Sequence, residues 1–143
     1  MRSGYAARSV DHRALIEQLA VAFRAADLAA FQQGLAPDTV LVLEGDSRLS
    51  GRYEGIGQVM GFIAKIHRMV RPGSLDLRRV SDAPAGIEID LVLAIRGLKG
   101  IEEQSLVDEV VFAGDGRVQT SRLRASASQE QLDRLLDAHA ELS

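Results

Sequence analysis

The sequence lacks cysteine and tryptophan, and aromatic residues make up only 4% of its 143 positions. Without cysteine the chain has no disulfide framework, no thiolate nucleophile and no cysteine ligand for a metal ion. It also lacks the run of about 20 apolar residues that a membrane-spanning helix needs, because its strand-like apolar stretch, 87–95, contains Glu88 and Asp90. The first residues carry no apolar segment of the kind a secretory signal requires, so the cytoplasm is the expected location.

An excess of charge of one sign is missing as well. The 17 lysine and arginine residues and the 20 aspartate and glutamate residues are spread along the chain and give a net charge of -3. With no basic stripe to neutralise phosphates, nucleic acid is not expected as a partner. Hydrophobic residues reach 46%, which allows a buried core at this length. Residues 1–143 are therefore expected to form one domain, with a core over about 11–125.

Helical periodicity predicts four helical segments. Asp11 can cap the first, along which apolar residues recur at helical spacing. These are Leu15, Ile16, Leu19, Ala20, Ala22, Phe23 and Ala26. A short segment over 28–34 follows and stops before Pro37, which excludes a helical residue ahead of it. A third helix is expected over 56–70 and a fourth over 128–142, where Ser128 can act as the cap.

Extended segments are predicted at 39–43 and 48–53, and then at 74–82, 86–96, 103–113 and 117–125. Consecutive strands with short links form an antiparallel meander, so the expected fold class is α+β. In segment 86–96, large aliphatic residues alternate with charged or smaller ones, which predicts a strand with one buried face. The residues expected to face the helices are Ile87, Ile89, Leu91, Leu93 and Ile95.

Three short motifs mark this order of elements. The first is the segment 35–40, Leu-Ala-Pro-Asp-Thr-Val; the second is a hairpin over 45–55 of the form G-x-S-x-L-x-G-x-Y-x-G; the third is Phe112 followed by Asp-Gly-Arg-Val at 115–118. Together, over about 11–125, they resemble the SnoaL-like family of the nuclear transport factor two-like superfamily. Glycine, proline and the Asp-Gly turn shape the backbone, so these motifs indicate the fold rather than the reaction.

The resemblance implies a cone-shaped, curved antiparallel sheet wrapped around the N-terminal helices, a cystatin-like arrangement, with the last helix as an extra element. It also implies a pocket for a small apolar molecule and chemistry without a cofactor. It further points to a homodimer. We expect the dimer to form through the outer face of the sheet, where apolar residues interrupt the charges. These residues are Val92, Ala94, Val107 and Val111.

Asp108 is the candidate catalytic residue. It resembles the oxyanion-hole aspartic acid of ketosteroid isomerases, which lies on the matching strand before Phe112. Period-two alternation puts it on one face with Leu106 and Val110, and desolvation by such a wall raises the pKa of a carboxyl group. The alternative is a register shifted by one residue, which would leave Asp108 solvated. The tyrosine and the base of those isomerases fall at Leu19 and at Leu43 or Glu44, so their usual dyad is absent.

Five further residues are candidates for ligand binding, and four of them also have a structural alternative. Glu44 ends a strand and is either turned inward or exposed, and Tyr53 either reaches a ligand or packs beneath a helix. His67 borders an apolar helix face and is either a proton carrier or half exposed. Ser121 shares the inner face of the last strand but has no adjacent His-Asp pair to make it a nucleophile. Phe112 completes the set. No spacing of histidine and carboxylate residues suggests a metal site.

Two functions follow from this set. The first is a SnoaL-like enzyme that performs cofactor-independent acid-base chemistry on an apolar, oxygenated metabolite. This class includes isomerases, cyclases, dehydratases and hydrolases. The second is a non-catalytic module that binds a hydrophobic ligand or a protein partner, which a nearly apolar inner surface favours. Asp108 separates the two hypotheses, because only the first requires it to transfer a proton.

Overall fold

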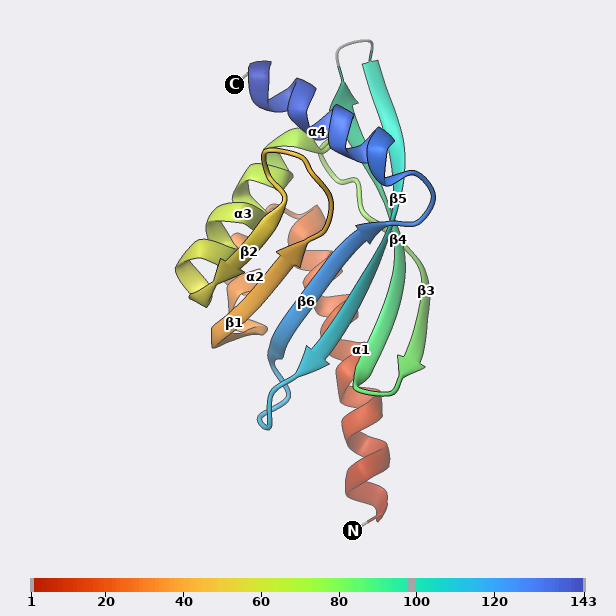
Figure 1. Ribbon diagram of the computed structural model, residues 1–143. Coiled ribbons are helices and arrows are strands. Elements are labelled where there is room, and N and C mark those ends of the chain that lie inside the picture. Colours follow the sequence, from red (N-terminus) through yellow and green to blue (C-terminus); the bar gives the residue numbers. More distant parts are fainter. Residues whose placement is uncertain (1, 98–99, 143) are drawn as a thin grey trace.

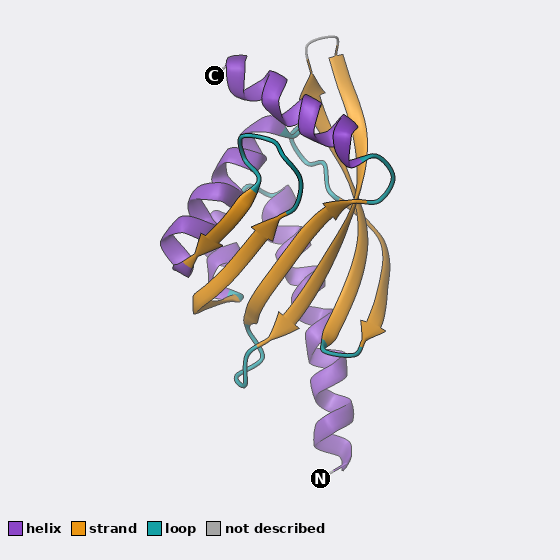
Figure 2. Ribbon diagram, viewed as in Figure 1, coloured by secondary structure: helices purple, strands orange, loops and turns teal. Residues whose placement is uncertain are grey.

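The computed structural model describes residues 2–97 and 100–142, and it confirms the α+β class (Figures 1 and 2). Three helices precede the main run of strands: α1 (Arg2–Arg24), α2 (Leu28–Gln33) and α3 (Gly55–Met69). The strands are β1 (Leu35–Leu43), β2 (Gly51–Glu54), β3 (Asp76–Ala83), β4 (Gly86–Gly97), β5 (Gly100–Phe112) and β6 (Val118–Ala125). A last helix, α4 (Gln129–Leu142), follows the sheet. No helix among the described residues is long and apolar enough to cross a membrane.

The six strands form one curved sheet in the order β2-β1-β6-β5-β4-β3. Strands β3 to β6 form the antiparallel meander that the sequence predicts. One pair differs, because β1 runs parallel to β6. Thr39 links the two strands further, since its hydroxyl donates to the Gln119 carbonyl at 3.2 Å. The two strands lie about 80 residues apart in sequence, so no turn between them signals how they pair.

The core lies between the inner face of the sheet and the helices α1 to α3, which Figure 1 shows behind the strands. The alternating residues of β4 are all buried, as predicted, and meet Phe23 of α1 and Phe62 of α3 within one hydrophobic cluster. Burying an aliphatic or aromatic side chain of this size stabilises the fold by about 1.5–3 kcal/mol. This packing fixes which face of each strand points inward.

Several predicted boundaries shift. Helix α1 begins at Arg2 rather than at Asp11 and ends at Arg24. Strand β1 begins at Leu35 and includes Pro37, which lies in an irregular stretch between Leu35 and Val40 where the pairing with β6 changes register. A proline is tolerated there because no ladder hydrogen bond needs its nitrogen. Strand β2 begins only at Gly51.

Two predicted helix starts keep their boundaries. Asp27 caps α2, where its carboxylate accepts a hydrogen bond from the Ala30 amide at 3.1 Å. Ser128 caps α4, where its hydroxyl accepts from the Gln131 amide at 3.1 Å. Each cap satisfies an amide that has no partner within its own helix.

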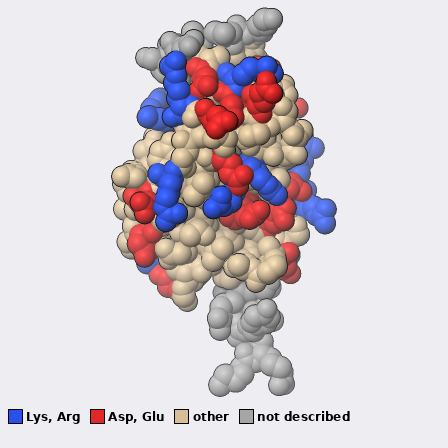
Figure 3. Space-filling view, in the orientation of Figure 1, with Lys and Arg blue, Asp and Glu red and all other residues tan. Residues whose placement is uncertain are grey.

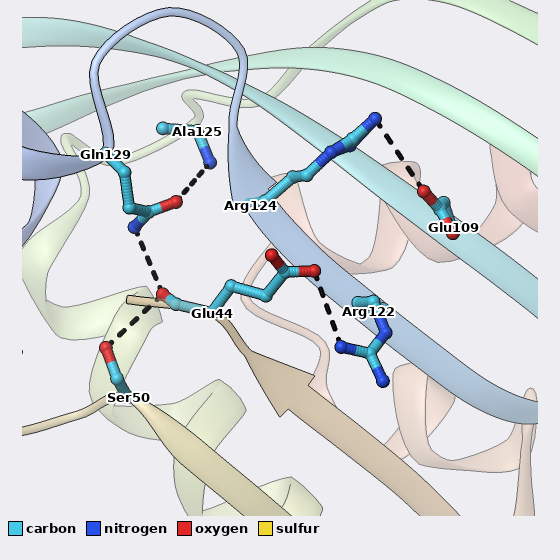
Figure 4. A network of polar contacts seen from close by, with 7 residues as sticks. All are labelled: Glu44, Ser50, Glu109, Arg122, Arg124, Ala125 and Gln129. Atoms are coloured by element: carbon cyan, nitrogen blue, oxygen red, sulfur yellow. Dashed lines mark hydrogen bonds and ion pairs between the residues drawn. The ribbon is translucent and has the colours of Figure 1, made fainter. Parts of the chain in front are cut away.

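Helix α4 docks across one end of the sheet (Figure 1). Its apolar side buries Leu132, Leu135 and Leu136. Its polar edge binds the loop after β1 through three side chains spaced four residues apart. Gln129 donates a hydrogen bond to the Glu44 carbonyl at 3.0 Å. Asp133 accepts from the Asp46 amide at 2.8 Å, and Asp137 accepts from the Arg48 amide at 2.7 Å. Figure 4 shows the Gln129 end of this contact. Helix α4 therefore closes one end of the space under the sheet.

The outer face of the sheet carries paired charges, which Figure 3 shows as interspersed red and blue side chains. Arg124 lies 3.9 Å from Glu88 and 3.7 Å from Glu109. Of the four residues predicted to leave an apolar patch here, Ala94 and Val107 are buried within the chain, and Val92 and Val111 are half-buried. Val107 lies directly opposite Arg124, whose long aliphatic stem can cover a small neighbour. The predicted patch is therefore smaller than expected, and the homodimer stays a prediction.

Candidate functional site

A cavity lies between the inner face of the sheet and the helices. Its larger lobe has a volume of about 140 Å³, and Asp108 is the only polar residue among the described residues of its wall. The other lining residues come from the four helices, from all strands except β2, and from the segment just before β3. They are Ile16, Leu19, Phe23, Phe31, Leu43, Phe62, Ile63, Ile66, Leu75, Leu77, Ile89, Leu91, Leu93, Ile95, Leu106, Leu123, Leu132 and Leu136. A molecule in this lobe would be surrounded by hydrocarbon except at one carboxyl group.

A smaller lobe of about 80 Å³ adjoins the first one. The two lobes share several wall residues, Asp108 and Leu123 among them. The smaller lobe adds two hydroxyl groups, those of Thr39 and Ser121. Thr39 is almost fully buried, and its hydroxyl already donates to the Gln119 carbonyl. Asp108 therefore borders both lobes, and among the residues that the structure describes it is the only ionisable side chain in either wall.

Strand pairing explains how Asp108 reaches this position. On β5 it lies opposite Ile89 of β4 and Leu123 of β6, both of which line the cavity. Its carboxyl oxygen Oδ1 accepts a hydrogen bond from the Ser121 hydroxyl at 2.6 Å. The structure thus places Asp108 on the inner face with Leu106, as period-two alternation predicts, and brings Ser121 to it. The chemical role of both residues stays a prediction.

The surroundings of Asp108 alter its acidity. Burial among apolar side chains raises the pKa of its carboxyl group from 3.8 to about 7. The hydrogen bond from Ser121 lowers this pKa, and the negative charge of neighbouring Glu109 raises it slightly. The residue as a whole is half-buried, because it lines the cavity and the cavity leaves part of it accessible. Both the protonated and the ionised forms are therefore populated near neutral pH.

This shift predicts how stability depends on pH. Because the folded pKa lies above the unfolded one, the folded chain binds more protons between about pH 3.8 and 7. The contribution of Asp108 is fully present below pH 3.8 and is lost as pH rises to about 7, with a slope of at most about 1.4 kcal/mol per pH unit. Urea unfolding of the wild type and of Asp108→Asn across this range measures the difference. Parallel curves for the two proteins would contradict the predicted shift.

Three of the other predicted ligand-binding residues lie away from both lobes. The Tyr53 hydroxyl donates to the Leu49 carbonyl, its ring packs 4.7 Å from that of Phe62, and burial raises the pKa of its hydroxyl. His67 meets Phe23 edge-on at 5.1 Å. The Glu44 carboxylate points to Arg122, 3.4 Å away on the outer side of the sheet (Figure 4). For each of these three residues the structural alternative is the one observed.

Phe112 also lies outside the cavity, contrary to the prediction. The pairing of β5 with β6 changes register between Val111 and Phe112, so alternation no longer holds at the end of the strand. The Phe112 ring stacks on that of His12, with 3.8 Å between centroids. Both rings line a separate, open groove at the β5-β6 turn.

Some wall residues were not identified as site residues from the sequence. Leu132 and Leu136 lie in the segment predicted as the last helix, and nothing local in the sequence indicates that this helix closes a cavity. Leu19 and Leu43, which were not among the candidate site residues, both line the larger lobe. Among the described residues no group of three or more His, Asp or Glu side chains gathers as metal ligands would.

Comparison with known proteins defines the fold. No family model matches the chain, and no curated protein matches it. It is similar to Bal32a from a soil-derived mobile gene cassette, with a TM-score of 0.80 and 14% identity over 90% of this chain and 98% of that one. It is also similar to an NTF2-like protein of unknown function from Burkholderia pseudomallei, with a TM-score of 0.73 and 18% identity over 90% and 98% of the two chains.

A third similar structure contains a ligand. It is RV0760c from Mycobacterium tuberculosis in complex with estradiol-17beta-hemisuccinate, with a TM-score of 0.69 and 16% identity over 83% of this chain and 96% of that one. At these identities the similarities show the fold alone. The chain therefore has the nuclear transport factor two-like fold that its motifs predict, and the SnoaL-like branch stays a prediction.

Proposed function

We propose that this protein is an isomerase-type enzyme of the SnoaL-like kind, which moves a proton within a small, neutral, oxygenated apolar molecule by means of Asp108. One observation carries the proposal: a single carboxyl group, with a pKa of about 7, lies in a cavity wall that is otherwise almost entirely apolar. Strongly shifted carboxyl groups in cavities mark functional candidates. RV0760c, which shares the fold, forms a complex with a small organic molecule.

Cavity size and charge define the class of substrate. The larger lobe, at about 140 Å³, is close to the engineered cavity of about 150 Å³ that binds benzene. A single ring with one or two substituents fits this space, whereas a steroid does not. An anionic molecule would be desolvated in an apolar wall next to a carboxylate, which is costly. The substrate is therefore a neutral, monocyclic or similarly small compound with one oxygen for Asp108 to meet.

The presence of one ionisable group favours a proton shift over reactions that need a separate acid and base. In a β,γ-unsaturated ketone, ionised Asp108 takes the proton from the carbon between the carbonyl and the double bond. The electron pair of the broken C–H bond forms a double bond to the carbonyl carbon, and the π pair of the carbonyl moves to its oxygen, which gives a dienolate. Asp108 then returns the proton to the γ-carbon, which gives the conjugated ketone and regenerates the carboxylate. A pKa near neutral pH makes the carboxylate a stronger base than an ordinary aspartate while part of it stays ionised.

Cyclohex-3-en-1-one is a suitable probe, since it is neutral, monocyclic and carries one oxygen. We expect the protein to convert it to cyclohex-2-en-1-one, followed by the absorbance of the conjugated product, and to incorporate deuterium from D2O at the carbon that exchanges its proton. A β,γ-unsaturated steroid ketone is the size control and should neither bind nor react. Absence of both conversion and exchange with a ketone that binds the cavity would contradict the enzymatic role.

The second candidate function is a non-catalytic ligand-binding module. It is favoured by the larger lobe, where no second polar side chain assists Asp108 in stabilising charge on a reacting molecule. Binding of small cyclic ketones or alcohols without conversion, unchanged in Asp108→Asn, would support this function. The same ligand panel therefore distinguishes the two candidates.

Two further expectations belong to this proposal. The homodimer implied by the resemblance would form on the outer face of the sheet, where Val92 and Val111 remain half-buried between charged neighbours. The cytoplasm is the proposed location, and neither a cofactor nor nucleic acid is needed for the proton shift.

A further inference from the structure

Asp108 and Ser121 are diagonal neighbours on the inner face of the sheet. Asp108 of β5 lies opposite Leu123 of β6, and Ser121 lies opposite Val110. Side chains two residues apart across an antiparallel pair can touch when one of them is polar and suitably directed. Here the Ser121 hydroxyl donates to Oδ1 of Asp108 at 2.6 Å, a length typical of a hydroxyl bound to a carboxylate.

The other carboxyl oxygen is free. Among the described residues Oδ2 of Asp108 has no hydrogen-bond partner. In the described part of the chain, Arg124 Nη1 is the one fully enclosed side-chain atom without a hydrogen-bond partner. Oδ2 also lacks a partner, so it is not fully enclosed. Oδ2 is therefore accessible, and Asp108 borders both lobes of the cavity.

We infer that Ser121 is the positioning residue of this site: its hydroxyl holds Oδ1 of Asp108, so that Oδ2 is the oxygen presented to a bound molecule. What this arrangement means for proton transfer rests on the proposed function. With Oδ1 engaged, the proton taken from the substrate arrives on Oδ2 and leaves from it. The hydrogen bond also favours the ionised carboxylate against the effect of burial, which keeps the base active near neutral pH.

In the described part of the chain, no other charged group shares the cavity wall with this pair. The ionisable side chains on the strands around it are directed to the outer face of the sheet, because their neighbours in sequence line the cavity. They are Glu88 and Asp90 on β4, Glu109 on β5, and Arg122 and Arg124 on β6. The helices contribute only apolar residues to the two lobes. Ser121 is therefore the side chain best placed to control the acidity of Asp108.

The test compares Ser121→Ala with Ser121→Thr, which keeps the hydroxyl, and with Thr120→Val, which removes a hydroxyl from the opposite side of the same strand. Carbon-13 NMR of the Asp108 carboxyl gives its pKa in each ligand-free protein. Loss of a hydrogen bond to a carboxylate is expected to raise this pKa by about one pH unit in Ser121→Ala. Ser121→Thr and Thr120→Val should titrate like the wild type. Deuterium exchange of cyclohex-3-en-1-one against pH then shows whether the reaction follows the same group.

The outcomes separate the inference from the proposed function. If the pKa rises in Ser121→Ala and the exchange profile moves to higher pH with it, both stand. If the pKa rises but the wild type exchanges no protons, Ser121 still positions Asp108 and the enzymatic role is wrong. An unchanged pKa in a folded Ser121→Ala overturns the inference. So does a raised pKa with an unmoved exchange profile, because the reaction would then not depend on this hydrogen bond.

Discussion

Leu91→Asp should unfold the protein or bring it close to unfolding at neutral pH. Leu91 is 7% exposed and lines the cavity, where its neighbours are hydrocarbon. A carboxyl group there must take a proton at pH 7, which costs about 4 kcal/mol for three pH units, or remain ionised at a greater cost. Loss of the leucine burial adds about 2 kcal/mol. Because Leu91 is two residues from Ile89, the partner of Asp108, a second carboxyl group would also lie diagonally across from the first.

Thermal and urea unfolding measure this effect, and Val42→Asp is the matched control. Val42 lies on β1 between buried Leu41 and Leu43, so it faces the other side of the sheet, and it is only half-buried. The same change there should cost at most about 1 kcal/mol. The stability of a domain of this size is about 5–15 kcal/mol, and the two variants should therefore be easy to tell apart. A Leu91→Asp protein that melts like the wild type would mean that the inner and outer faces of β4 are reversed.

Asp108→Asn should abolish the proton shift while the fold persists. General acid-base catalysis by one side chain contributes about 10²–10⁴ in rate, and an amide cannot accept the proton. The variant should lose at least about 100-fold in conversion and in deuterium exchange. It should still bind the ketone, because the cavity wall is otherwise unchanged. At pH 7 and above it should be as stable as the wild type or more so, since a buried amide avoids the cost of ionisation.

Asp90→Asn makes the same substitution on the outer face of the sheet and should leave the rate unchanged. Initial rates with cyclohex-3-en-1-one, measured for all three proteins under saturating ketone, give the comparison. If Asp108→Asn keeps the wild-type rate, another group performs the chemistry. If the wild type itself has no activity but binds the ketone, the protein is the binding module.

Much of the fold could be predicted because the alternation of residues along strands and the caps of helices are visible in short stretches of sequence. The alternation in β4 determines its buried face, and Ser128 marks the start of the last helix by capping it. What could not be predicted depends on distant residues. The parallel pairing of β1 with β6 and the change of register before Phe112 leave no pattern in the sequence around them. The first helix extends beyond Asp11 because a possible cap does not prevent a helix from starting earlier.

The candidate site follows the same division. The face of Asp108 was predictable from alternation along β5, because Leu106 and Val110 are buried on the same side. The hydrogen bond that Ser121 donates to Asp108 could not be predicted, since it depends on the register between two strands. For Glu44, Tyr53 and His67 the sequence left two alternatives open, and contacts with Arg122, Leu49 and Phe23 decide for the structural one. Residue type suggests a role, and only the position of the backbone decides whether the side chain reaches the site.

Helix α4 has a consequence for how proteins with this sheet diversify. It supplies Leu132 and Leu136 to the cavity wall but is attached through side-chain hydrogen bonds to the loop after β1, without entering the ladder of the sheet. One boundary of the cavity is therefore set by a segment that follows every strand in the sequence. Changes confined to 129–142 can deepen or shorten the cavity while the sheet, Asp108 and Ser121 stay as they are. Under the proposed function, the size of the substrate and the proton chemistry can thus evolve independently.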